Sequence, residues 1–149
     1  MILEAHGVRI ELPASWSGHL FERDQLVGMH VANYPVALAD TSTFGDKSTD
    51  RMRPGNAFVA LVEYRPGAGL EPGHGLYAPR RIPLPLDPTS FSARRLAHPR
   101  TGQVGTQHFF TTAERPFCAY VVLAGDSLQR RPAIAAVNLV LRSMEVKAR

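Results

Sequence analysis

The chain contains a single cysteine and no long apolar run, and each of these shortages excludes a class of protein. With Cys118 alone, no disulfide can form within the chain, and nothing indicates an oxidising compartment. The longest mostly apolar stretches, 57–62 and 119–125, are far too short to span a bilayer. The N-terminal residues show neither the basic stretch nor the apolar segment of a signal peptide. We therefore expect a cytoplasmic protein with no membrane contact.

The sequence is equally poor in catalytic and ligand-binding signatures. A zinc site usually includes one pair of ligands close in sequence, whereas the closest histidines here are ten residues apart. His19 and His30 are the one pair that a hairpin would bring face to face. Cys118 lies in the middle of an expected strand, where a free cysteine belongs to the core, and the glycines of 67–75 open no helix for phosphate. We expect no metal, no cofactor and no catalytic residue.

The rest of the composition is that of one ordinary folded domain, with 149 residues that are 44% hydrophobic and 20% charged. Apolar residues first alternate at the period of a strand and later recur at the period of a helix, over 132–142. Asp126 or Ser127 is expected to cap this helix. The expected fold is α+β, a mainly antiparallel sheet of about five to seven strands with a C-terminal helix before the last strand. Candidate strands are 2–5, 8–12, 18–23, 28–34, 57–64, 91–96, 105–112, 116–124 and 143–146.

Two stretches between the expected strands are predicted to be loops. Residues 39–56 are polar, with room for one helical turn near 46–52, and residues 65–89 are rich in proline and glycine. Binding residues concentrate on loops held by a rigid scaffold, so we expect the 65–89 loop to be the contact surface. The predicted contact residues are Arg80, Arg81, Tyr77, Leu84, Arg94 and Arg95.

The basic charge is carried almost entirely by arginine, and the formal net charge is +4. Arginine binds carboxylates and phosphates through two parallel hydrogen bonds, but the same bias is also expected from a GC-rich genome. The pairs at 80–81, 94–95 and 130–131 would form a patch for an anionic partner if the fold brought them together. Nucleic acid is disfavoured, because the chain offers neither stacking aromatics beside these arginines nor a free recognition helix.

Two segments at the ends of the chain resemble one known group of proteins. The stretch 8–16 reads Val-Arg-Ile-Glu-Leu-Pro-Ala-Ser-Trp, which resembles the opening strand and Leu-Pro-x-x-Trp turn of the PsbP/Mog1-like superfamily. The strand at 116–123, the helix after it and the closing stretch 140–146 are similar to that group's C-terminal hairpin strand, helix and final strand. The resemblance implies an antiparallel sheet flanked by helices. Together with the arginine bias it suggests a high-GC bacterial member, such as an actinobacterial one.

The resemblance also implies a function, because members of this superfamily mostly act through protein contacts. They include a partner of a nuclear-transport GTPase, a photosystem subunit and chaperones of secreted bacterial effectors. We therefore expect a non-enzymatic protein-interaction module, an adaptor or chaperone-like partner of another bacterial protein, with a homodimer left open. The alternative is a small-molecule-binding or enzymatic domain whose site lies under the 65–89 loop.

Overall fold

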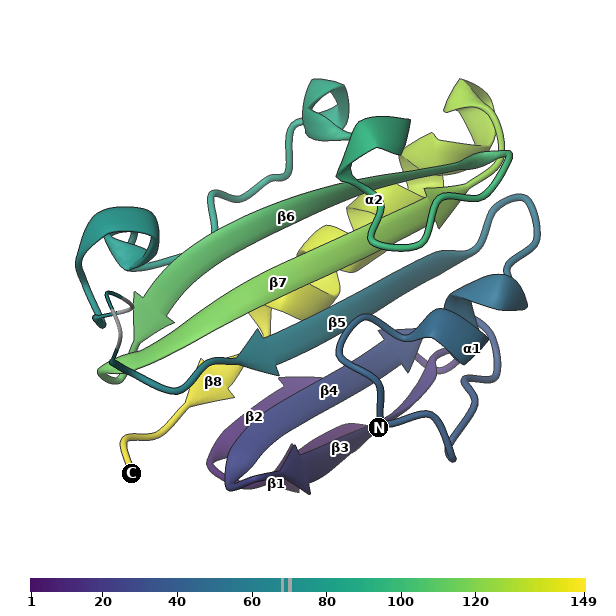
Figure 1. Cartoon of the computed structure of the whole chain (residues 1–149). Helices are drawn as coiled ribbons and strands as arrows, with labels where there is room; N and C mark the ends of the chain where they lie inside the picture. Colours follow the sequence, from purple (N-terminus) through teal and green to yellow (C-terminus); the bar gives the residue numbers. More distant parts are fainter. Residues whose placement is uncertain (68, 70) are drawn as a thin grey trace.

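Two antiparallel sheets and one long helix make up the computed structural model, which describes residues 1–67, 69 and 71–149 (Figure 1). In the described part of the chain the main sheet has five strands in the order β3-β4-β5-β7-β6, and a smaller sheet has three in the order β1-β2-β8. The strands are β1 (Ile2–Ala5), β2 (Val8–Glu11), β3 (Ser17–Arg23), β4 (Leu26–Ala32), β5 (Ala57–Glu63), β6 (Gln103–Thr112), β7 (Arg115–Ala124) and β8 (Glu145–Val146). The helices are α1 (Asp46–Asp50) and α2 (Ser127–Arg142), and short 3-10 turns are η1 (Gly75–Tyr77), η2 (Pro88–Ser90) and η3 (Ala93–Arg95).

Three hairpins, β1–β2, β3–β4 and β6–β7, each turn through two residues with positive φ, at 6–7, 24–25 and 113–114. Such turns match the right-handed twist of the strands that they join. At Gly7 glycine is required, because φ is +82° and a Cβ there would lie 2.8 Å from Nη1 of Arg115.

The main sheet is buried on both faces, which explains the continuous apolar sequence of its central strands. On one face α2 and the small sheet pack side by side, so that Val8 and Ile10 share a core with Val137 and Val140. On the other face the loops on either side of α1 cover a second cluster that includes Phe58 (Figure 1). The α+β class and the antiparallel sheet expected from the sequence are confirmed, as is the C-terminal helix before the last strand.

A buried ion pair ties the small sheet to the main one. Glu63 at the end of β5 accepts hydrogen bonds from Nε and Nη2 of Arg115 at 2.8 and 3.1 Å. The same guanidinium donates to the carbonyl oxygens of His6 and Lys147, and Arg149 donates to Glu63 as well. The network therefore fixes the β1–β2 turn and the chain after β8 against the main sheet.

The helix α2 begins earlier than its apolar period indicates. The apolar period extends only from 132, but the helix begins at Ser127 and its N-cap is Asp126, which confirms one of the two caps expected from the sequence. Asp126 accepts from the amide of Gln129 at 3.0 Å, and the Gln129 side chain accepts from the amide of Asp126 at 2.8 Å. This capping box stabilises a first turn whose exposed Leu128 gives no amphipathic signal.

Replacing Asp126 by alanine is expected to lower the free energy of unfolding by about 1 kcal/mol, because an amide at the start of α2 loses its acceptor. Chemical denaturation of the purified variant measures this change. Asp126→Ser is the matched control, since serine is also a good N-cap and should stay close to the wild type. Equal losses in the two variants would contradict the cap.

The structure corrects three predictions about strands. The expected single sheet is two sheets, and the last strand is Glu145–Val146 rather than 143–146. Residues 91–96 do not form an edge strand: Ser92 makes one bridge to Gly105, after which the chain turns into η3. This turn lets Leu96 point back to the core while Arg94 and Arg95 stay exposed. None of the helices in the described residues is long and apolar enough to cross a membrane.

Candidate functional site: a groove beside the edge strand β6

The strand β6 forms one edge of the main sheet, and the middle of its outer edge is open. Ser92 pairs with Gly105 through two backbone hydrogen bonds of 3.0 Å, and the amide of Thr111 donates to the Pro79 carbonyl at 2.8 Å. Along a strand, the N–H and C=O groups of successive residues point alternately to the two sides. Because those of Gly105 and Thr111 point outward, the N–H and C=O groups of Gln107 and Phe109 point outward as well. Within the described residues these four groups have no hydrogen-bond partner. The sheet therefore ends in a short row of free donors and acceptors.

The chain between Pro79 and Ser92 runs as an arch beside this edge. It leaves β6 near Thr111, packs the buried side chains of Ile82 and Leu86 into the core under α2, and returns to β6 at Gly105. The amide of Leu86 donates to Oδ1 of Asn138 at 2.9 Å, which fixes the arch to the middle of α2. Figure 1 shows this segment passing above β6, away from the strand.

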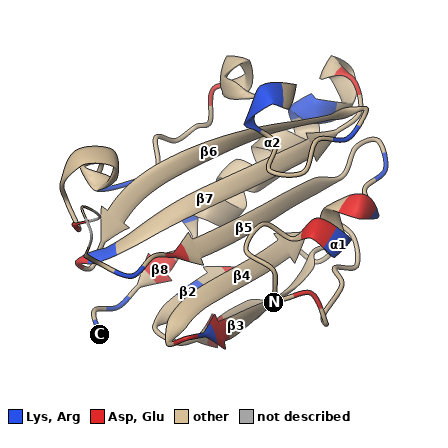
Figure 2. Cartoon of the chain, viewed as in Figure 1, with Lys and Arg blue, Asp and Glu red and all other residues tan. Residues whose placement is uncertain are grey.

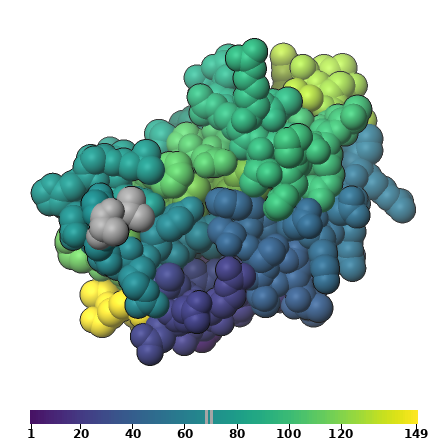
Figure 3. Space-filling model, in the orientation of Figure 1, coloured from purple at the N-terminus to yellow at the C-terminus, as the bar shows by residue number. Residues whose placement is uncertain are grey.

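A groove of about 1060 Å³ lies between the arch, the outer part of β6 and the end of α2. We call it the β6 groove. In Figure 3 the 71–100 segment (teal to green) covers the upper border of the molecule, from the left side of the view to the top. Its lining is Leu76, Pro79, Arg80, Arg81, Ile82, Pro83, Leu84, Pro85, Gln107, His108, Phe109, Phe110, Thr112, Leu141, Arg142, Met144 and Val146. Most of these side chains are apolar, as is usual for a binding site.

The charged groups of the groove lining are three arginines. Arg80 forms an ion pair of 3.0 Å with Glu114, but both side chains are largely exposed, so the pair is weak. Arg81 and Arg142 are exposed and form no ion pair within the described residues. Figure 2 shows blue segments on the chain above both ends of β6. The groove is therefore cationic as well as apolar.

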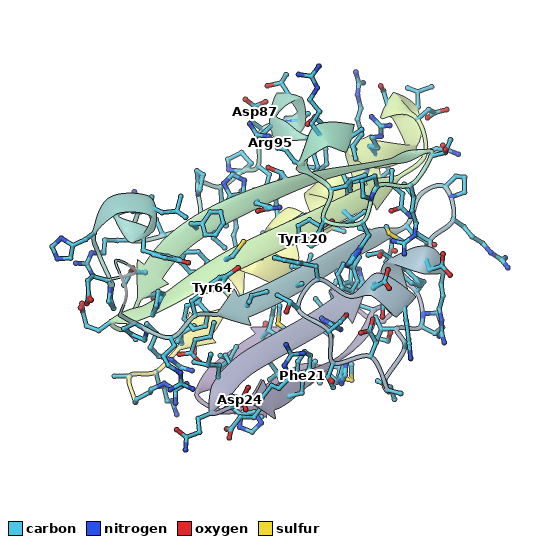
Figure 4. All side chains as sticks on the ribbon, viewed as in Figure 1. Phe21, Asp24, Tyr64, Asp87, Arg95 and Tyr120 are labelled. Carbon is cyan, nitrogen blue, oxygen red and sulfur yellow. The ribbon has the colours of Figure 1, made fainter. Side chains whose placement is uncertain are left out.

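Among the described residues, His108 is the only histidine that lines the groove. Burial lowers its pKa, and the charge of Arg95 lowers it further, so the imidazole is neutral at pH 7. Figure 4 shows Arg95 on the segment that follows the arch. No carboxylate lines the groove in the described part of the chain, so His108 has no acidic partner there. The arrangement favours the binding of an anionic, partly apolar ligand.

The structure places the six predicted contact residues in three groups. Arg80, Arg81 and Leu84 line the groove. Arg94 and Arg95 lie in η3, where the Arg95 carbonyl accepts from the Gln107 side chain at 3.2 Å.

Tyr77 is the exception among these residues. It is 2% exposed and packs against Tyr64 and Phe109, so it supports the loop from inside.

The two arginine pairs lie at opposite ends of the open edge. The pair 80–81 follows Pro79, which is hydrogen-bonded to Thr111, and the pair 94–95 follows Ser92, which is paired with Gly105.

The groove also contains groups that sequence reasoning missed. The alternation over 105–112 predicts a strand that contains Gln107 and Phe109, but the position of this strand at the edge depends on strand order. The helical period predicts that Arg142 ends the helix, whereas its approach to the loop depends on the path of the arch. The proline spacing over 79–88 was the one available signal, because it prevents the loop from pairing continuously with β6.

The two histidines expected to face each other do so. His19 and His30 are paired across the β3–β4 hairpin, with ring centroids 5.6 Å apart. His30 is fully buried, and its Nε2 lies 2.8 Å from the Ser42 carbonyl. Burial lowers its pKa to about 4. No group of three or more His, Cys, Asp or Glu that could hold a metal occurs among the described residues.

Cys118, the other candidate for chemistry, is completely buried in β7. Burial raises the pKa of its thiol to about 12, which opposes formation of the nucleophilic thiolate. Its side chain therefore belongs to the core, as the sequence predicted.

Comparison with known proteins adds no information about the site. No family model matches the chain, and neither the curated proteins nor the solved structures contain a match.

Proposed function

We propose that this protein is a cytoplasmic, non-enzymatic protein-interaction module, an adaptor or chaperone-like partner that binds another protein in the β6 groove. The observation that carries the proposal is the open edge at Gln107 and Phe109, which borders an apolar groove where Arg81 and Arg142 form no ion pair with the described residues. The PsbP/Mog1-like resemblance supports the same function, because proteins of that group mostly act through protein contacts.

The composition of the groove supports binding to a protein. Apolar walls gain free energy when a partner removes them from water, and the arginines select a partner with carboxylates. The competing proposal is a small-molecule site under the 65–89 loop. The groove volume favours this competing proposal in part, because about 1060 Å³ is close to the upper limit of roughly 1,000 Å³ for ligand pockets.

Site-specific photo-crosslinking in cells of the native organism tests the proposal. Leu76 lines the groove and is 57% exposed, so a photoreactive residue there should capture the partner. Leu38 is the matched control, because it is 65% exposed and lies outside the groove lining. We expect one protein adduct of constant mass from position 76 that is absent from position 38.

Charge reversal shows whether the adduct depends on the groove. Arg81→Glu should reduce the yield at position 76, whereas Arg53→Glu, exposed after α1 and outside the lining, should not. Adducts that are equal at positions 76 and 38 would overturn the proposal. A small molecule retained in native mass spectra, together with no protein adduct, would establish the competing one.

A further inference from the structure

We infer that the β6 groove binds an extended segment of the partner as an additional strand, paired to the backbone of Gln107 and Phe109 and carrying an acidic side chain toward Arg81 and Arg142. The inference rests on the proposed function and specifies its binding mode. It concerns the chemistry of the bound segment rather than the identity of the partner.

The backbone of β6 provides the first argument. Gln107 and Phe109 present two N–H and two C=O groups outward, in the alternating geometry that an antiparallel or parallel neighbour strand requires. Main-chain hydrogen bonds of this kind provide affinity without demanding a particular sequence, and side-chain pockets then provide specificity. An irregular or helical segment would leave these four groups unpaired.

The ends of the open edge set the length of the bound segment. The bridge between Ser92 and Gly105 closes one end, and the hydrogen bond between Pro79 and Thr111 closes the other. At about 3.3 Å per residue the interval 105–111 spans roughly 20 Å. A short linear motif fits this interval, and a long strand does not.

The walls of the groove suit the side chains of such a segment. Residues of a strand alternate between the two faces, so every second side chain would point toward the partly buried Leu84, Met144 and Val146. The others would point toward the face of Phe109. The bound segment should therefore alternate apolar residues with polar ones.

The charge of the groove selects against a second copy of this chain. Its β6, Gln103–Thr112, contains no acidic residue, so pairing of two β6 strands would place no strand carboxylate against Arg81 and Arg142. Two copies would also bring together molecules with a net charge of +4 each. A segment with an aspartate or glutamate complements the site.

The test uses a displayed library of short random peptides with the folded full chain as bait. We expect the enriched peptides to combine alternating apolar residues with at least one acidic residue. In the complex, the amides of Gln107 and Phe109 should become protected from hydrogen exchange, while amides of β3 at the opposite edge should not change. Protection of β3 instead of β6 would overturn the inference.

Backbone methylation of an enriched peptide provides a matched pair of probes. Methyl groups on the alternate amides that face β6 should weaken binding by about tenfold or more, and the same number on the other amides should leave it unchanged. Equal effects of the two patterns would show that the peptide does not bind as a strand.

Charge exchange completes the test. Arg81→Glu should weaken the binding of the acidic peptide by about tenfold. It should strengthen the binding of a peptide in which lysine replaces the acidic residue, whereas Arg53→Glu should change neither affinity. If position 76 captures a protein but the amides of Gln107 and Phe109 stay unprotected in its complex, the groove is a binding site and strand addition is wrong. Protection of these amides that grows with protein concentration alone would identify a second copy as the occupant and also overturn the inference.

Discussion

Replacing Arg115 by alanine should lower the free energy of unfolding by about 3–5 kcal/mol, because it leaves a buried carboxylate without its main partner. Arg115 is 4% exposed and Glu63 is 5% exposed, so water cannot replace the lost hydrogen bonds without opening the fold. The carbonyl oxygens of His6 and Lys147 would lose their donor in the same substitution. Chemical denaturation of the wild type and the variant measures the difference.

The surface pair of Arg80 and Glu114 is the matched control, because it has a similar distance but lies in water. Arg80→Ala should cost no more than about 1 kcal/mol. Replacing both buried partners, as Glu63→Leu with Arg115→Met, should recover part of the loss, since no buried uncompensated charge remains although the amide of Val27 loses its acceptor. Similar costs for Arg115→Ala and Arg80→Ala would show that the buried network contributes little.

Acid should destabilise the protein well before its carboxylates titrate, through His30. Burial lowers the pKa of His30 from 6.5 to about 4, so between these values the unfolded chain binds a proton that the folded protein excludes. Stability is therefore full above about pH 6.5 and falls as the pH decreases toward 4, by roughly 2–3 kcal/mol. Burial lowers the pKa of His19 as well, which acts in the same direction.

His30→Gln isolates this contribution, because glutamine can still donate to the Ser42 carbonyl but does not titrate in this range. The free energy of unfolding of the variant should change less than that of the wild type between pH 7.5 and 4.5, by roughly 2 kcal/mol. Asp40 and Glu63 do not interfere, because hydrogen bonds outweigh burial and hold the pKa of each below its ordinary value. Parallel pH profiles of the wild type and the variant would contradict the assignment to His30.

The local elements of the fold could be predicted from the sequence, because alternation and helical spacing depend on residues close in the chain. The sequence could not predict that strands 2–5 and 8–12 belong to a separate sheet. Alternation shows that one side of a strand is buried, but it does not show which strand lies beside it. The pairing of Glu63 with Arg115 was missed for the same reason. It joins β5 to β7, strands that are separated along the chain by the loops and β6.

Of the candidate site, the sequence could predict some side chains but not the open backbone edge. Arginine pairs and apolar residues in the 65–89 loop indicated a contact surface, and the structure places Arg80, Arg81 and Leu84 in one groove. The burial of Tyr77 was not predicted, because one aromatic residue in a short stretch between Gly75 and Pro79 gives no periodic signal. The open edge was invisible in the sequence, because it is a property of strand order.

The closed ends of the β6 edge have a consequence for the protein at high concentration. An open strand edge is a template on which chains can stack into fibres. Here a stacking chain would be stopped by Ser92 on one side and Pro79 on the other, and repelled by arginines of its own kind. The closed ends therefore limit strand pairing at this edge to a short segment, and the same geometry opposes unlimited growth of a filament.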